Sequence, residues 1–404
     1  MLDDLTELYS SEWISPETMN ARLIRSGVPS RILHSQRSNR ERFNARYRIR
    51  VNGLCSTIVT PSIRGSKSGG LSIGGVLSSG HEDGLFRRME KAAIRALYTV
   101  GTDVGEVEII ALPGRRYAVN EIIPRKMNPP LLNSKLVDSK GQDEETRILM
   151  GMDPEFILVN KEGDVVPASL YLDRYGIAGS DAVRVGDEVS YPLGELRPAP
   201  HADPDGLLKA MRAAMHTAQQ CITDTSLQWR AGGLPAPGLP LGGHIHFSGV
   251  PLTMSVLQCL DNYLALPLAI VEDPAGRGRR PRYGFLGDFR IQPYGGFEYR
   301  TLPSFMVSPL ISKASLYIAY LIALHHDRLR ARPLNRERYH KAYYGGMKEV
   351  LREVAEKLHQ DLTRLPEYLT YSKVIDRLFE QIKEGRNWDE SRDIRPLWNI
   401  PAVP

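Results

Sequence analysis

Four short segments of the sequence each carry two side chains of catalytic type separated by a single residue. The pairs are Asp153 and Glu155, Glu195 and Arg197, His244 and His246, and Glu298 and Arg300. Side chains alternate faces along a β-strand, so residues i and i+2 point the same way. If the four segments are strands of one sheet, four carboxylates, two imidazoles and two guanidiniums converge on one surface. Such a surface suits divalent cations and a polyphosphate.

A single pair of this kind has an ordinary alternative interpretation. A carboxylate and an arginine on an exposed strand usually form a solvated face or a surface ion pair. The coincidence of four pairs favours a site, as does the glycine beside three of them: Gly194, Gly242-Gly243 and Gly295-Gly296. Glycine allows the backbone to approach a bulky ligand closely.

The types of side chain in the pairs restrict the cation. Groups dominated by carboxylates favour Mg²⁺ or Mn²⁺ over zinc, and Cys55, Cys221 and Cys259 are all far from the pairs in the sequence. Four carboxylates against two arginines leave a charge of about −2, and a bound triphosphate would add about −4. Two or three divalent ions would balance that charge.

Length and composition indicate an ordered protein of two or three domains, with 404 residues, 42% hydrophobic and 25% charged. The N-terminus is acidic and has no apolar run, so we expect no secretory signal. The apolar stretch 314–324 is too short to span a bilayer. Three widely separated cysteines argue against a disulfide framework. The expected compartment is the cytoplasm.

The first section, residues 1–130, is predicted to be a small α+β domain. Residues 45–60 have the pattern of two strands around a turn at Asn52-Gly53. Residues 85–99 have the pattern of an amphipathic helix, and residues 104–123 that of a hairpin with its turn at Pro113-Gly114.

This section is also rich in arginine. Seven lie close together: Arg31, Arg37, Arg40, Arg42, Arg46, Arg48 and Arg50. The last three alternate with apolar residues, which predicts a strand with one basic face that could meet an anionic ligand. A solvated basic surface is the alternative. The glycine-rich stretch 65–84 lacks a fixed phosphate-binding motif and is predicted to be a flexible loop.

Residues 131–147 are polar and aperiodic, and we interpret them as a linker. The catalytic domain is assigned to residues 148–330, with strands alternating with helices, and residues 331–404 to a helical C-terminal part of it. Asp203-Pro204 and Ser308-Pro309 each predict a helix start, with a capping side chain before a proline. A third helix, residues 253–272, is expected to kink at Pro267.

The order D-x-E, G-E-L-R-P, G-G-H-I-H-x-S and E-Y-R over residues 149–330 resembles the carboxylate–amine ligases of the glutamine synthetase and glutamate–cysteine ligase superfamily. The phage-type COOH–NH2 amidoligase branch is the most similar. The resemblance implies an α+β fold: an antiparallel, saddle-like sheet with helices on one face, here preceded by a smaller α+β domain. It also implies that ATP phosphorylates a carboxylate and that an amine then attacks the acyl phosphate.

The resemblance also implies roles for individual residues. The expected metal ligands are Asp153, Glu155, Glu195, His244 and Glu298. The expected contacts to ATP are His246, Arg280, Arg282 and Arg290. The expected catalytic residues are Arg197, Glu298 and Arg300, with Arg300 stabilising the transferring phosphoryl group. The family's first metal ligand is usually Glu, so Asp153 is a shorter variant.

Residues 85–124 resemble the final part of an ATP-grasp domain. That resemblance implies that Glu108, Glu121 and Asn120 hold magnesium. The usual Glu-x-Asn order is not reproduced, and the section is too short for a complete domain of that kind. A truncated relative and a plain accessory domain both remain open.

The function expected from these patterns is an ATP- and Mg²⁺-dependent ligase, with Mn²⁺ as an alternative ion. Its partners would be a small-molecule or peptide carboxylate and an amine, and we expect neither nucleic acid nor a membrane. A metal-dependent hydrolase or phosphotransferase using the same face remains open, as does a degenerate anion- or nucleic-acid-binding scaffold.

Overall fold

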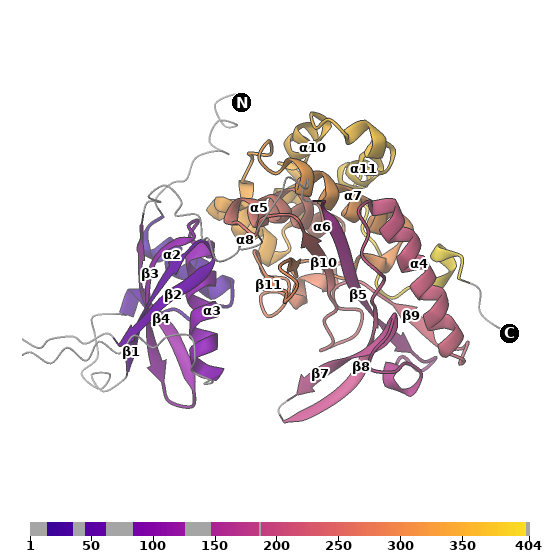
Figure 1. Ribbon diagram of the computed structural model, residues 1–404, viewed down its shortest axis with the longest axis horizontal. Coiled ribbons are helices and arrows are strands. Elements are labelled where there is room, and N and C mark those ends of the chain that lie inside the picture. Colours follow the sequence, from indigo (N-terminus) through magenta and orange to yellow (C-terminus); the bar gives the residue numbers. More distant parts are fainter. Residues whose placement is uncertain (1–13, 35–44, 62–83, 126–146, 186, 401–404) are drawn as a thin grey trace, which may run out of the picture. The chain divides into compact units, whose positions relative to one another are not determined.

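A computed structural model describes residues 14–34, 45–61, 84–125, 147–185 and 187–400. Most of the glycine-rich stretch (65–83), most of the predicted linker (131–146) and Arg37, Arg40 and Arg42 lie outside these residues. The chain divides into two compact units, Met1–Lys140 and Gly141–Pro404 (Figure 1). We refer to them as unit 1 and unit 2.

Unit 1 is a four-stranded antiparallel sheet with two α-helices in its described part. Its elements are α2 (Pro16–Arg25), the 3-10 turn η2 (Ile32–His34), β1 (Arg46–Asn52), β2 (Cys55–Pro61), α3 (Gly84–Thr99), β3 (Val104–Leu112) and β4 (Arg116–Pro124). The strand order is β2-β1-β3-β4. The turn between β1 and β2 is formed by Gly53 and Leu54, both with positive φ, one residue beyond the predicted position.

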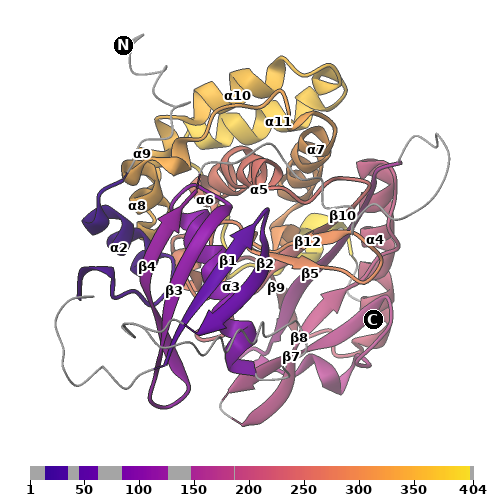
Figure 2. The ribbon, with the colours of Figure 1, turned by 60° about the vertical axis from the view of Figure 1, so that its left-hand side comes forward.

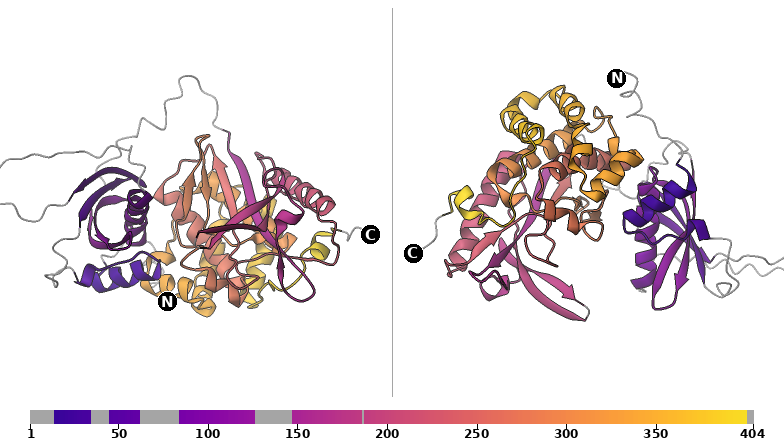
Figure 3. Two further views of the ribbon diagram at one scale, coloured as in Figure 1. Left: turned by 90° about the horizontal axis from the view of Figure 1, so that it is seen from below. Right: turned by 180° about the vertical axis from the view of Figure 1, so that it is seen from behind.

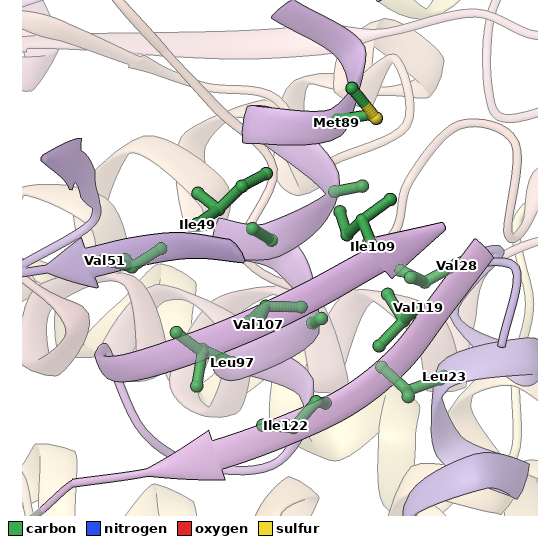
Figure 4. Close-up of a cluster of buried hydrophobic side chains, with 13 residues drawn as sticks. Leu23, Val28, Ile49, Val51, Met89, Leu97, Val107, Ile109, Val119 and Ile122 are labelled. Carbon is green, nitrogen blue, oxygen red and sulfur yellow. The ribbon is translucent and has the colours of Figure 1, made fainter. Parts of the chain in front are cut away.

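The core of unit 1 lies on one face of this sheet (Figure 4). Ile49 on β1 and Val107 on β3 are buried with Met89 and Leu97 of α3. Period-two alternation then places the arginines of β1 on the opposite face. The predicted hairpin and amphipathic helix are therefore confirmed, and one side of the sheet is left for charged residues.

Unit 2 contains an eight-stranded antiparallel sheet. Its strands are β5 (Leu149–Val159), β6 (Val165–Val166), β7 (Ala178–Val185), β8 (Glu188–Leu196), β9 (Gln228–Arg230), β10 (Gly243–Ser248), β11 (Phe289–Ile291) and β12 (Phe297–Tyr299). The order is β11-β12-β10-β5-β8-β7, and β6 and β9 also pair with β5. This antiparallel α+β architecture confirms the expected fold class.

The described α-helices of unit 2 are α4 (Pro204–Cys221), α5 (Met254–Leu260), α6 (Leu266–Val271), α7 (Pro309–His325), α8 (Glu337–Gly345), α9 (Lys348–Arg352), α10 (Ala355–Thr363) and α11 (Tyr368–Lys383). Of these, α4, α5 and α7 begin where the sequence predicts. Asp203 caps α4 through Gly206 N–H, and Ser308 caps α7 through Ile311 N–H. The helices of unit 2 group beside the strands, while the β7–β8 hairpin extends away from them (Figures 2 and 3).

One helical run of unit 2 is unusually apolar. Met254–Val271 is long and apolar enough to cross a membrane, and 83% of it is buried inside the protein. It is longer than the apolar stretch 314–324. Between α5 and α6 the run contains a π-helical turn, Asp261–Ala265, directly before the predicted break at Pro267.

Candidate active site

The four paired segments lie on neighbouring strands of the unit 2 sheet. Across β12, β10, β5 and β8 the register places three sets of site residues opposite one another: Glu298 and His246, His244 and Asp153, and Glu155 and Glu195. Arg197 and Arg300 directly follow the last residues of β8 and β12. The expected convergence of these side chains therefore occurs.

Asp153, His246 and Glu298 form the first cation group. One ligand-type atom of each lies within 4.8 Å of the others. His246 Nε2 lies 3.1 Å from Asp153 Oδ2. His244 Nδ1 adjoins the same group, 3.0 Å from Asp153 Oδ1 and 3.1 Å from Glu298 Oε1. The sequence assigned the metal to His244 and the phosphates to His246, whereas the geometry brings both imidazoles to Asp153.

Glu155, Asp181 and Glu195 form the second cation group. Their carboxylate oxygens lie within 4.8 Å of one another, and both glutamates are buried. Glu155 Oε2 accepts a hydrogen bond of 2.6 Å from Gly242 N–H, which orients that carboxylate. Asp181 was absent from the predicted ligands because its strand, β7, was not predicted. Gly186-Asp187 between two β-type runs was the available hairpin signal.

The pKa values in the second cation group reflect unbalanced negative charge. Burial raises the pKa of Glu155 to about 7, against the lowering effect of His244. Burial, together with the charge of Asp153, raises the pKa of Glu195 to about 8, although Arg197 pairs with it. A bound cation would oppose both shifts, because its charge favours the ionised carboxylates.

The first cation group behaves differently because it contains imidazoles. Burial disfavours an imidazolium, yet the Asp153 carboxylate outweighs that effect and raises the pKa of His244 to about 10. Burial alone would raise the pKa of Asp153, but the charges and close contacts of His244 and His246 together outweigh it. The pKa of Asp153 therefore falls well below its usual range.

The residues of the first cation group also fit a divalent cation by their hydrogen bonding. Asp153 Oδ1, Glu298 Oε1, His244 Nδ1 and His246 Nε2 are all buried and make no hydrogen bond of good geometry, although these side chains contact one another as ion pairs at 3.0 to 3.1 Å. Each is an atom of a metal-ligand type, and buried polar atoms of native proteins normally have partners. A cation would satisfy these oxygens and nitrogens together.

Two arginines flank Glu298. Arg300 Nε lies 3.1 Å from Glu298 Oε1, and Arg290 Nη1 lies 3.3 Å from Glu298 Oε2. Gln292 Nε2 donates to the same carboxylate at 2.8 Å, and Tyr294 Oη lies 3.4 Å from His246 Nδ1. Gln292 and Tyr294 were not predicted, because their loop has no period-two pattern.

Arg197 lies at the other end of the acidic row. We use this name for the carboxylates across β12, β5 and β8, which are those of Glu298, Asp153, Glu155 and Glu195. Its guanidinium pairs with Glu195, and it donates to the Arg174 carbonyl oxygen at 3.3 Å. Gly179 makes this position possible, because a Cβ there would collide with the Arg197 guanidinium. The expected catalytic arginines therefore lie at opposite ends of the acidic row.

Arg280, unlike Arg290 and Arg300, lies apart from Glu298 and has a buried guanidinium. This guanidinium pairs with Glu272 and stacks over the Tyr343 ring at 4.6 Å. The charge of Arg280 is thus already matched inside the protein, and its contact with ATP stays a prediction. Arg282 is exposed and stacks on Tyr283, and its role stays a prediction.

The glycines beside the pairs make room for the protein's own groups. A Cβ at Gly194 would collide with the Phe156 ring, and a Cβ at Gly242 would collide with the His244 imidazole. At Gly243 and Gly296, backbone carbonyl oxygens occupy the space. Close approach is required at these positions, as expected, but what approaches is the protein itself.

The candidate residues of unit 1 lie in an ion-pair network. Arg46 and Asn120 both donate to Glu108 Oε1, at 3.0 and 2.7 Å. Arg48 lies 3.7 Å from Glu121 and 3.8 Å from Glu108. The basic face predicted on this strand therefore meets carboxylates of the neighbouring strands.

Residues 150–400 match the family model described as phage phiEco32-like COOH.NH2 ligase-type 2. No curated protein matches the sequence significantly.

Three solved structures illustrate the structural similarities. A bifunctional glutathione synthetase from Pasteurella multocida is 11% identical with a TM-score of 0.38, over 62% of this chain and 48% of the other. Glutamate–cysteine ligase from Francisella tularensis, in complex with AMP, is 9% identical with a TM-score of 0.41, over 63% and 87%. GmaS without ligand is 16% identical with a TM-score of 0.33, over 59% and 70%. The chain thus spans about half the length of the first of these proteins.

Proposed function

Because the chain belongs to the phage phiEco32-like COOH–NH2 ligase-type 2 family, we propose that it joins a carboxylic acid to an amine at the expense of ATP, on the polar face of the unit 2 sheet. The observation that carries the proposal is the acidic row itself. Two cation groups lie side by side through Asp153 and Glu155 of β5, with an arginine at each end.

The two cation groups would hold Mg²⁺ or Mn²⁺. Their ligands would be Asp153, His246 and Glu298 in the first group, with His244 adjoining, and Glu155, Asp181 and Glu195 in the second. Ions bound there would neutralise the phosphate oxygens of ATP. Strand pairing sets the relative positions of these ligands. All of them except Asp181 lie on β12, β10, β5 and β8, which pair with one another in that order.

In the first step of the proposed reaction, a carboxylate oxygen of the acid attacks the γ-phosphorus of ATP. The bond from that phosphorus to the bridging oxygen breaks, and ADP leaves with the electron pair. Arg300 would meet the charge that develops on the transferring group, with Arg290 beside it, because a guanidinium stays charged and can bind two oxygens. Both arginines contact Glu298, which limits their freedom before ATP arrives.

In the second step, the neutral amine nitrogen attacks the acyl carbon of the acyl phosphate. The carbon–oxygen bond to phosphate breaks, phosphate leaves, and the nitrogen loses a proton to give the amide. Arg197 lies at the opposite end of the row from Arg300, beside Glu195. We assign it to an anionic group of the acid substrate, which separates acid from nucleotide along the sheet.

Hydroxylamine tests this proposal, because it traps an acyl phosphate as a hydroxamate. The full chain is incubated with ATP, Mg²⁺, hydroxylamine and a panel of amino acids, short peptides and cell-wall acids. We expect one class of acid to give both ADP and a hydroxamate in equal amounts. ADP release at the same rate without any acid would instead indicate a phosphohydrolase and overturn the proposal.

A further inference from the structure

Asp261 is an acidic residue in the middle of the apolar, buried run Met254–Val271. It is 2% exposed and opens the π-helical turn between α5 and α6. A buried carboxylate is costly unless its oxygens accept hydrogen bonds. Its neighbour Asn262 accepts at 2.9 Å from the N–H of Leu334, a residue outside the candidate site. Asp261 is different, because its partners lie in the segment that carries Arg290 and Arg300.

Asp261 Oδ1 accepts from two groups on either side of the β11–β12 hairpin. Tyr299 Oη donates to it at 2.7 Å, and Gly287 N–H donates at 3.1 Å. Tyr299 is the last residue of β12 and separates Glu298 from Arg300, while Gly287 lies two residues before β11 begins. One carboxylate oxygen therefore holds together the two chain ends of the hairpin.

The hairpin depends on such anchoring because its ladder is short. β11 and β12 each contain three residues, and β11 is the edge strand of the sheet. Arg300 lies beyond the ladder, and its N–H donates to the Asp288 carbonyl oxygen at 2.9 Å. Asp288 N–H in turn donates to Thr301 Oγ1 at 3.3 Å. The backbone of Arg300 is thus set by residues 287–288, which Asp261 fixes from the buried side.

We propose that Asp261 is a positioning residue for the reaction: through Tyr299 and Gly287 it places Arg290 and Arg300 against Glu298. The inference rests on the proposed function only in stating that this placement of Arg290 and Arg300 serves catalysis. The contacts themselves predict a measurable local effect without any turnover.

Tyr299→Phe is the main test, because it removes one hydroxyl and leaves the ring that packs beneath the sheet. Tyr263→Phe is a matched control. Tyr263 is also fully buried and also donates to a carboxylate, Asp361 Oδ2 at 2.9 Å, but it holds Ala331 N–H instead of the hairpin. Both variants should lose thermal stability, so stability alone does not separate them.

Turnover should separate the two variants. Misplacing a catalytic group by about 1 Å can cost on the order of 100-fold in rate, so we expect Tyr299→Phe to lower kcat by at least 10-fold. The KM for ATP should change by a smaller factor than kcat, because Arg300 is assigned to the transferring phosphoryl group and not to the binding of ATP. Asp261→Asn should show the same division between kcat and KM. Equal losses of kcat in Tyr299→Phe and Tyr263→Phe would show a general effect of core packing and overturn the proposal.

Hydrogen exchange supplies a readout that needs no activity. The amide protons of Gly287 and Arg300 should exchange faster in Tyr299→Phe than in the parent, and at the parent rate in Tyr263→Phe. Unchanged exchange in Tyr299→Phe would overturn the positioning role even if the parent proves to be a ligase. Faster exchange with no turnover in the parent, for any acid tested, would retain the anchoring and reject the proposed function.

Discussion

Both units present charged side chains at every second position on one face of an antiparallel sheet, but β1 and β3 of unit 1 pair those charges in the opposite way to β5 and β8 of unit 2. In unit 1, Arg48 lies opposite Glu108 and Arg50 opposite Glu106, so unlike charges meet across the strands. In unit 2, Glu155 lies opposite Glu195, and Asp181 joins them. Period-two spacing is therefore no indication of a site by itself. The cross-strand partner decides whether a face is neutralised or left acidic.

The sharpest way to test this contrast is to remove one carboxylate from each face. Glu298→Gln keeps the shape and removes one charge from the first cation group, so nucleotide turnover should fall on the order of 1000-fold or more. Glu108→Gln makes the same change in unit 1, and turnover there should stay within about two-fold of the parent. The measurement is acid-dependent ADP release at saturating Mg²⁺.

Loss of turnover in Glu108→Gln would remove the contrast. It would show that unit 1 contributes an essential site, as its resemblance to the end of an ATP-grasp domain implies. Full activity in Glu298→Gln would instead remove the proposed site from unit 2.

Arg300→Lys tests whether an arginine that pairs with a carboxylate has a catalytic role in unit 2 and only a structural role in unit 1. Lysine keeps the charge but loses the planar fork, so we expect kcat to fall on the order of 100-fold with little change in the KM for ATP. Arg46→Lys is the matched change in unit 1 and should leave kcat unaltered. Near-parent activity in Arg300→Lys, with a clear drop in melting temperature, would support a purely structural ion pair with Glu298.

The raised pKa values of the second cation group should make the stability of the protein depend on pH. The pKa values of Glu155 and Glu195 are raised to about 7 and about 8, so the folded state holds protons that the unfolded state has released above pH 5. Stability should therefore fall as pH rises from about 5 to 8, by on the order of 5 kcal/mol, since each pKa unit corresponds to about 1.4 kcal/mol. Urea denaturation at a series of pH values measures this.

Adding Mg²⁺ should reverse that trend. The ion competes with protons for the same oxygens, so its stabilisation should grow between pH 6 and 8 and disappear in Glu195→Gln. A stability that is independent of pH and of Mg²⁺ over this range would contradict an unbalanced acidic face.

The smallest expected effect is in unit 1. Arg46→Gln leaves Glu108 with its hydrogen bond from Asn120, so the free energy of unfolding should fall by only about 1 kcal/mol. The loss should change little with salt, because the side chains of Arg46 and Glu108 are only 16% and 4% exposed. A loss that disappears at high salt would show that the pair is solvated and screened.

The sequence could predict the strands of the site, because period-two pairs and proline-marked helix starts are local signals. Asp203 and Ser308 cap helices as expected, and all four pairs reach one sheet. Asp181 could not be found from its own neighbourhood, because its strand alternates weakly and its partner is set by the β7–β8 register. The pairing of Arg280 was also missed: its partner Glu272 lies only eight residues earlier, at the C-terminal end of α6, but no regular period links the two positions.

The register of β10 has a further consequence. His244 and His246 share one face, while Ile245 between them is fully buried on the other and lies opposite Tyr299 and Met152. A slip of one residue would turn both imidazoles into the apolar core and expose the isoleucine, which is costly on both counts. A chain that mispairs at β10 therefore loses stability and the site together. Folded but inactive molecules with a shifted strand should not accumulate, so the hydrophobic core acts as a check on the assembly of the catalytic face.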